Sequence, residues 1–322
     1  MRPCLILVAH CSMHEWKEDV ENFEVSLGFL RQKYLKNQNS ETVSESVEAK
    51  YNDGNFRRIE SRSRPTVLRS KDGGIFGYRV PAFLVSEDLS HIRGLEEWVA
   101  EFQSILPRQF DEKRNVECVR RYGHWVKYSE GGQLKETGDY RQDGLVARKF
   151  FEYTSSFWSR IGECFPKRRL SKVFRDLTQY SLNIGQQRMC GLWTVCAVNV
   201  AVNGNSVETT RHRDVQGFFN GMSCLCPFGT FEGGGLILWE PEAIVELKSG
   251  DLFFFVDHLI NHSNETAYGL RNSVVAFMED KTWVWMQKTY KFTDRRVRPA
   301  RNAQKRFRKR GETMQEKRRM NK

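Results

Sequence analysis

The sequence predicts an α+β protein in which a β-sandwich or barrel follows a largely helical first half. After Gly191, short runs rich in Val, Phe, Leu and Trp alternate with Gly and Asn clusters, as expected for many short strands. Before that point, apolar residues recur at helical spacing near residues 95–105, 146–162 and 170–180. Twenty-two Phe and eight Trp among 322 residues supply side chains for a packed, sheet-rich core.

Turn signals and apolar runs place the expected elements. A hairpin is expected around Asp72-Gly73, a strong turn signal between two apolar runs. Residues 12–35 mix charged and apolar positions at roughly helical spacing and predict one or two helices. Residues 36–64 are polar and have no period, so we expect a surface loop or linker there. The later apolar runs predict strands at 192–202, 222–226, 235–240, 244–247, 251–256, 272–278 and 282–286.

Charge divides the chain into a neutral body and a basic tail. Residues 288–322 hold fifteen Lys or Arg against three Asp or Glu, whereas the other 287 residues hold 36 basic and 37 acidic residues. We expect an N-terminal helical segment and polar linker over 1–64, a main domain over 65–287 with its core in 191–287, and the tail over 288–322. The tail could contact nucleic-acid phosphates, serve as a nuclear localisation signal, or be a solvated extension.

The eight cysteines are expected to be reduced thiols in the cytosol or nucleus. The apolar run at residues 5–9 is too short for a secretory signal, and no apolar stretch reaches the length of a membrane span. Cys224-Leu-Cys226 favours a buried strand face over half of a metal site, because no second cysteine pair accompanies it.

The residues that carry chemistry begin with His212-Arg213-Asp214. On an extended chain, residues two apart point to the same face, so an imidazole and a carboxylate can reach one metal ion. His262 lies 48 residues beyond Asp214 and supplies a second imidazole. Two histidines and one carboxylate form the facial triad of non-haem Fe(II) oxygenases, which leaves three coordination positions open. His258 is the alternative second histidine; we prefer His262 because it is closer to the strand that follows.

Arg271, nine residues beyond His262, begins that strand, and Ser273 lies on its same face. An arginine there offers a planar fork that matches a carboxylate, as the distal end of 2-oxoglutarate would need, with the serine hydroxyl as a second donor. The alternative is an ordinary strand start that faces solvent. Arg213, between the two metal-ligand candidates, should point away from the metal, toward a phosphate or solvent.

These residues in this order resemble the 2-oxoglutarate/Fe(II)-dependent dioxygenase superfamily, whose fold is a double-stranded β-helix, or jelly roll. Over residues 65–287 the chain further resembles the TET/JBP-like DNA base dioxygenases, in their fungal-type branch. The segments that carry this resemblance besides the triad are Val198-Asn-Val-Ala-Val, Asn220-Gly, Phe228-Gly, Gly233-Gly-Gly-Leu, Ser249-Gly-Asp-Leu and His262-Ser-Asn.

The resemblance implies an oxidoreductase that uses Fe(II), 2-oxoglutarate and O2, with ascorbate as reductant, and that releases succinate and CO2. It implies that His212, Asp214 and His262 hold the metal and that Arg271 and Ser273 bind 2-oxoglutarate. The implied substrate is the methyl group of a modified base in DNA, 5-methylcytosine or thymine. A nuclear monomer that is not secreted and does not bind membranes is the corresponding expectation.

A base must leave the duplex and stack in a pocket before it can reach the metal. Phe218, Phe219 and Phe277 are the candidates for lining that pocket; core packing is the alternative for all three. The His-to-Arg spacing is shorter than in the animal and kinetoplastid members, and no Cys-rich insert is present. Two other functions therefore stay open: a hydroxylase of a protein side chain or small molecule, and a catalytically inactive DNA-binding relative.

Overall fold

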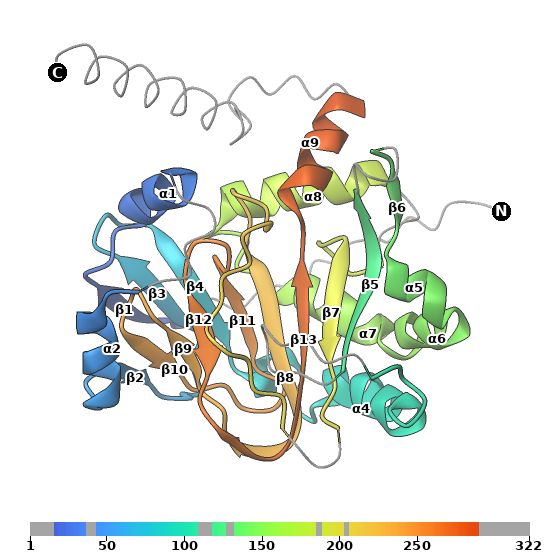
Figure 1. Ribbon diagram of the computed structural model, residues 1–322, viewed down its shortest axis with the longest axis horizontal. Coiled ribbons are helices and arrows are strands. Elements are labelled where there is room, and N and C mark those ends of the chain that lie inside the picture. Colours follow the sequence, from blue (N-terminus) through green and yellow to red (C-terminus); the bar gives the residue numbers. More distant parts are fainter. Residues whose placement is uncertain are drawn as a thin grey trace, which may run out of the picture.

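The computed structural model describes residues 16–36, 43–108, 118–126, 132–184, 189–202 and 206–289. Two β-sheets form its centre, and most of the helices pack outside the larger sheet (Figure 1). The larger sheet has the strand order β1 (Asp19–Phe23), β3 (Thr66–Ser70), β4 (Ile75–Val80), β11 (Leu252–Phe255), β8 (Ser223–Gly233), β13 (Ala267–Phe277), β7 (Val195–Asn199), β5 (Val119–Val126), β6 (Leu134–Glu136). The smaller sheet has the order β12 (His262–Asn264), β9 (Leu236–Leu238), β10 (Ala243–Val245), β2 (Arg57–Ile59). This is the α+β jelly-roll architecture expected from the sequence.

The helices precede the central strands in the chain, apart from one at the end of the described residues. They are α1 (Leu27–Lys36), α2 (Glu45–Asn52), α3 (Ala82–Val85), α4 (Ser90–Phe102), α5 (Gly138–Asp143), α6 (Leu145–Tyr153), α7 (Ser155–Cys164), α8 (Ser171–Ile184) and α9 (Asp280–Thr289). In the described part of the chain, no helix combines the length and the apolar composition that crossing a bilayer requires.

The hairpin and the cysteine-bearing strand follow the sequence prediction. Asp72-Gly73 forms the turn between β3 and β4, where Gly73 adopts a positive φ of 79°. Cys224 and Cys226 lie on one face of β8, and both are buried. Burial raises the pKa of both thiols, so each behaves as a small apolar side chain. The six cysteines within the described residues are all free.

Two expectations for the N-terminal residues were wrong. The first part of the helix expected over 12–35 is the strand β1, which pairs in parallel with β3 at the edge of the larger sheet. The loop expected over 36–64 contains α2 and the strand β2, which pairs in parallel with β10. Both strands are short edge strands with mainly polar side chains, so their apolar pattern is too weak to reveal them. Residues from 1–64 thus belong to both sheets.

Two further elements differ from the prediction. Residues 146–162 form two helices, α6 and α7, because the helical conformation is interrupted at Thr154. The Thr154 hydroxyl donates a hydrogen bond to the Phe150 carbonyl. Gly94 of α4 packs directly against the Tyr153 carbonyl next to this interruption, where a larger residue would not fit. The strand expected at 282–286 is instead part of α9, where Trp283 and Met286 are buried. A short apolar run fits a buried helix as well as a strand.

A buried ion pair joins the hairpin to the turn before β11. The Arg79 side chain is 1% exposed, and its Nε and Nη2 donate to Asp251 Oδ2 at 3.0 and 2.7 Å. The same guanidinium donates to the Arg62 carbonyl and the Ser61 hydroxyl. The other carboxylate oxygen, Asp251 Oδ1, accepts the Ala82 N–H at 2.8 Å. All groups of the pair are therefore hydrogen-bonded, as burial of opposite charges requires.

We predict that Asp251→Asn lowers the free energy of unfolding by about 3–5 kcal/mol, because it leaves the buried Arg79 charge without a counter-ion. Equilibrium denaturation in urea, followed by tryptophan fluorescence, measures this loss. Lys149→Ala, which removes an exposed ion pair with Glu152, is the matched control and should change stability by less than about 1 kcal/mol. Equal effects of the two substitutions would contradict the structural role assigned to Asp251.

Candidate metal centre and cavity

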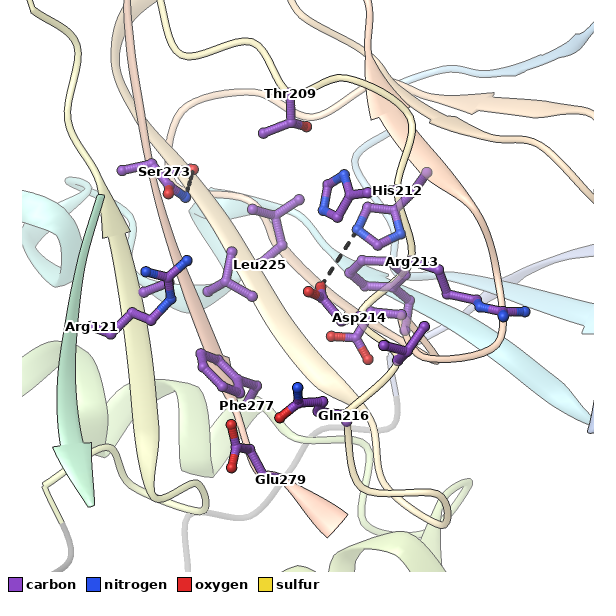
Figure 2. Close-up of a pocket in the computed structure, with 18 of the residues that line it drawn as sticks. Arg121, Thr209, His212, Arg213, Asp214, Gln216, Leu225, Ser273, Phe277 and Glu279 are labelled. Carbon is purple, nitrogen blue, oxygen red and sulfur yellow. Dashed lines mark hydrogen bonds and ion pairs between the residues drawn. The ribbon is translucent and has the colours of Figure 1, made fainter. Parts of the chain in front are cut away.

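His212, Asp214 and His262 come together, and their ligand atoms all lie within 4.8 Å of one another (Figure 2). Nε2 of His262 lies 3.7 Å from Asp214 Oδ2, and the two imidazole centroids are 4.3 Å apart. Two imidazoles and one carboxylate at this spacing can hold one divalent transition metal and leave positions open for other ligands. The three residues chosen from the sequence are thus brought to one point.

The backbone holds both histidines in the orientation that a metal needs. The N–H of each residue donates to the carbonyl of the other, His212 to His262 at 3.0 Å and His262 to His212 at 2.8 Å. Each ring also donates its Nδ1–H to a carbonyl, that of Thr210 at 2.7 Å and that of Ile260 at 3.0 Å. This tautomer places the lone pair of each ring on Nε2, the nitrogen that would bind the metal. Burial, with the neighbouring His212, lowers the pKa of His262 to about 4, so its ring is neutral at neutral pH.

His258, the alternative second histidine, lies outside this cluster. Its Nε2 donates to the Phe219 carbonyl at 3.1 Å, and its Nδ1 lies 3.7 Å from Asp257 Oδ1. The geometry therefore groups His262, and not His258, with His212 and Asp214.

The N-terminal helix α1 holds the segment that carries Asp214. The Tyr34 hydroxyl donates to the Val215 carbonyl at 2.7 Å, and the Tyr34 ring packs on Phe219 and His258 with centroids 5.6 and 5.8 Å apart. Burial raises the pKa of Tyr34 to about 12, so the phenol keeps its proton. The Arg213 guanidinium lies 5.6 Å from the same ring. Arg213 points away from the triad, as expected, but it is buried against Tyr34 and not in solvent.

Arg271 is a buried cation with incomplete hydrogen bonding. Its side chain is enclosed, and Nη1 donates to the Val207 carbonyl at 2.9 Å. Within the described residues, Nε and Nη2 have no hydrogen-bond partner. Burial lowers the pKa of Arg271 to about 10, which still leaves the guanidinium charged at neutral pH. A buried charge with unpaired donors is costly, so this arrangement favours an anionic ligand.

The glycine run before β9 makes room for this arginine. Gly234 adopts a φ of +67°, and a Cβ on it would lie 2.9 Å from Arg271 Cδ and 3.0 Å from Nε. Both the backbone conformation and the space exclude a side chain here. The motif Gly233-Gly-Gly-Leu thus lets the guanidinium lie directly against the chain.

One cavity of about 460 Å³ connects the metal cluster with Arg271 and continues to Phe277. That volume is in the range of small-molecule sites. Arg271, Ser273, Val275 and Phe277 all line it, because alternate residues of β13 share one face. Phe277 lies six positions beyond Arg271, a distance of about 20 Å along a strand, so the cavity has two distinct ends. Ser273 therefore faces the cavity and not solvent.

Of the three phenylalanines expected at the substrate pocket, only Phe277 lines the cavity. Phe218 and Phe219 lie outside it, contrary to expectation. Phe218 is 3% exposed and packs on Trp283 at a centroid distance of 4.8 Å, and Phe219 packs on Tyr34 and His258. After Asp214 the chain turns back into the core and carries both phenylalanines with it. Closeness to Asp214 in the sequence therefore does not place them in the cavity.

Several lining residues were missed by the sequence analysis. Arg121 on β5 enters the cavity from the strand beyond β7, and Gln216 and Glu279 lie at the end near Phe277 (Figure 2). Asn199 on β7 lines the cavity opposite Ser273. Thr209 lies toward the same end (Figure 2). Only the order of the strands in the sheet brings these residues together, and no motif in the sequence marks them.

We predict that Tyr34→Phe weakens metal binding by about tenfold, the lower end of the range for groups that orient metal ligands. The substitution removes the hydrogen bond to Val215, next to Asp214, and leaves that carbonyl without its donor. Calorimetric titration with Mn(II) measures the affinity. Tyr78→Phe, which removes the hydroxyl of a buried tyrosine that bonds to Glu18 and does not line the cavity, is the matched control. Equal Mn(II) affinity in the Tyr34→Phe chain and the unsubstituted chain would show that α1 does not support the triad.

Comparison with known proteins identifies the fold. No protein-family model matches the sequence, and no curated protein matches it. Among solved structures, NgTET1 in complex with 5mC DNA matches with a TM-score of 0.50 and 18% identity, over 78% of this chain and 92% of that chain.

Two other solved structures match more weakly. An oxidoreductase of the 2OG-Fe(II) oxygenase family from Burkholderia pseudomallei gives a TM-score of 0.39 and 14% identity, over 62% of this chain and 84% of that one. The collagen prolyl hydroxylase vCPH from Paramecium Bursaria Chlorella virus-1, in a 2OG complex, gives 0.30 and 12%, over 64% and 96%. These two scores are too low to carry an argument. The likeness to NgTET1 shows that this chain has the double-stranded β-helix fold that the sequence resemblance implied.

Proposed function

We propose that this protein is an Fe(II)/2-oxoglutarate-dependent dioxygenase that oxidises the methyl group of a modified base in DNA. The assignment of the two cofactors rests on one observation: two features line the same cavity. One is the His212, Asp214 and His262 cluster, and the other is the buried Arg271 with two unpaired donor nitrogens. A metal cluster alone would fit many enzymes, and a buried arginine alone would fit many anion sites. Together in one cavity, they match the needs of a metal ion and a dicarboxylic acid.

The residues present fit both groups. His212, Asp214 and His262 would hold iron, since this donor set is the one that non-haem Fe(II) sites use. Arg271 Nε and Nη2 would donate to the distal carboxylate of 2-oxoglutarate, and that carboxylate would supply the acceptors that these two nitrogens lack. When bound, iron and 2-oxoglutarate together supply the oxidising chemistry, with O2 consumed and succinate and CO2 released.

The protein's own contribution is position and exclusion of water. The backbone pairing of His212 with His262 sets the ligand geometry, and Tyr34 holds the segment that follows Asp214. The floor of the cavity is apolar between its two ends, where Leu225, Val275 and Ala197 line it. An apolar wall beside the metal favours a methyl group over a charged group as the part of the substrate that approaches it.

Three observations support a DNA base as the substrate. Phe277 offers an aromatic surface at the end of the cavity away from Arg271, and flipped bases stack on such side chains. The basic residues concentrated in 288–322 are suited to phosphate contacts. The neighbour with a TM-score of 0.50 is described in complex with 5mC DNA.

The proposal predicts that 5-methylcytosine DNA stimulates succinate formation from 2-oxoglutarate in the presence of Fe(II) and ascorbate. Mass spectrometry of the digested DNA should show a hydroxymethylated base. The control substrate is the same duplex with unmethylated cytosine, because any phosphate contact of the tail is equal in the two. His212→Ala should reduce both products to background, because it removes one metal ligand.

The outcomes separate the parts of the proposal. Fe(II)-dependent succinate formation that no DNA stimulates would keep the cofactors and move the substrate to a protein side chain or a small molecule. Oxidation of thymine and not of methylated cytosine would keep DNA and change the base. Absence of both metal binding and 2-oxoglutarate binding in calorimetry would overturn the enzyme proposal and favour a binding protein.

Arg271→Lys is predicted to weaken 2-oxoglutarate binding by at least about tenfold, because an ammonium group cannot make the paired contacts of a guanidinium. Mn(II) affinity should stay within about twofold, because Arg271 is not in the metal cluster. Calorimetry with Mn(II) first and 2-oxoglutarate second measures both values on one sample. A parallel loss of both affinities would show a general disturbance of the site, and no loss of either would remove Arg271 from the proposed binding role.

A further inference from the structure

Asn199 is a buried polar residue that lines the cavity from the end of β7. It lies on β7 directly opposite Ser273 of β13, since the antiparallel register pairs these two residues. Both line the cavity, and both side chains are buried, with 5% and 3% of their surface exposed. Asn199 Nδ2 donates a hydrogen bond to Ser273 Oγ at 2.9 Å. The link joins two strands at the end of the cavity that also contains Arg271.

The direction of this hydrogen bond decides what Ser273 can offer a ligand. A hydroxyl has one proton to donate and two lone pairs that accept. Because Ser273 Oγ accepts from Asn199, its own proton stays available for another acceptor. The reverse polarity would commit that proton to the Asn199 carbonyl and would leave a lone pair for the ligand, which a carboxylate repels.

Three hydrogen-bond donors can meet a ligand at this end of the cavity. Arg271 presents Nε and Nη2 as unpaired buried donors, and the Ser273 hydroxyl adds a third. A carboxylate accepts at both oxygens and can use all three. Among the described residues, the carbonyl oxygen Asn199 Oδ1 is itself without a hydrogen-bond partner, so the serine proton is not committed to it.

We propose that Asn199 is a positioning residue that fixes the polarity of the Ser273 hydroxyl, so that Ser273 donates to the distal carboxylate of 2-oxoglutarate. This inference rests on the proposed function. Asn199 acts through Ser273 and does not itself touch the co-substrate. This end of the cavity should therefore prefer a charged carboxylate over a neutral amide or ester. A donor that is already oriented makes a stronger hydrogen bond to an anionic acceptor than to a neutral one.

A double-mutant cycle tests the proposal on the full chain loaded with Mn(II). Asn199→Leu, Ser273→Ala and the combined variant are titrated with 2-oxoglutarate in a calorimeter. We expect Asn199→Leu to weaken binding by about tenfold, the scale of one hydrogen bond to a charged group. In the Ser273→Ala background the same substitution should cost less than about twofold, because the group through which Asn199 acts is gone.

Two controls separate this role from interstrand support. Asn272→Leu removes a buried asparagine of β13 that is not part of the cavity lining and whose Oδ1 accepts the Ala201 N–H. It should lower the melting temperature and leave 2-oxoglutarate affinity unchanged. Asn199→Asp keeps the size of the side chain but accepts the serine proton, so it should bind 2-oxoglutarate more weakly than Asn199→Leu.

Each outcome has a defined meaning. Equal losses from Asn199→Leu with and without Ser273 would overturn the proposal, because Asn199 would then act independently of the serine. A lower melting temperature with unchanged affinity, or an Asn199→Asp chain that binds as tightly as the unsubstituted one, would also overturn it. Failure of the unsubstituted, Mn(II)-loaded chain to bind 2-oxoglutarate would instead contradict the proposed function.

Discussion

Strand β13 hydrogen-bonds to β8 on one side and to β7 on the other, and this double pairing fixes the register of the whole site. A shift by one residue would turn every side chain of the strand to the opposite face. Arg271, Ser273 and Phe277 would then leave the cavity together. β13 is eleven residues long, so such a shift would be costly. It would move the side chains of one face to the other along the whole strand.

The sequence predicted well where chemistry demands particular residues at close spacing. His212 and Asp214 are two residues apart on an extended segment, and Arg271 and Ser273 are two residues apart on a strand. In both pairs the alternation of side chains is a local rule that needs no knowledge of the fold. The distal His262 was also found, because it lies closer than His258 to the strand that carries Arg271.

Contacts between distant parts of the chain could not be predicted in this way. Tyr34 and Val215 are 181 residues apart, and nothing near either one marks the other. Asn199 meets Ser273 only because β7 and β13 are neighbours in the sheet order. Phe218 shows the converse error: an aromatic residue close to a ligand in sequence was expected in the cavity, but the chain turns it into the core.

The mutual backbone hydrogen bonds of His212 and His262 make the alignment of the two rings a property of the folded chain. Carbonyls of the chain itself orient both rings, whereas small zinc domains need the metal in order to fold. A divalent ion that binds this cluster would therefore meet ligand atoms that are already aligned. Its affinity would then reflect coordination, with little of the binding free energy used to order the protein.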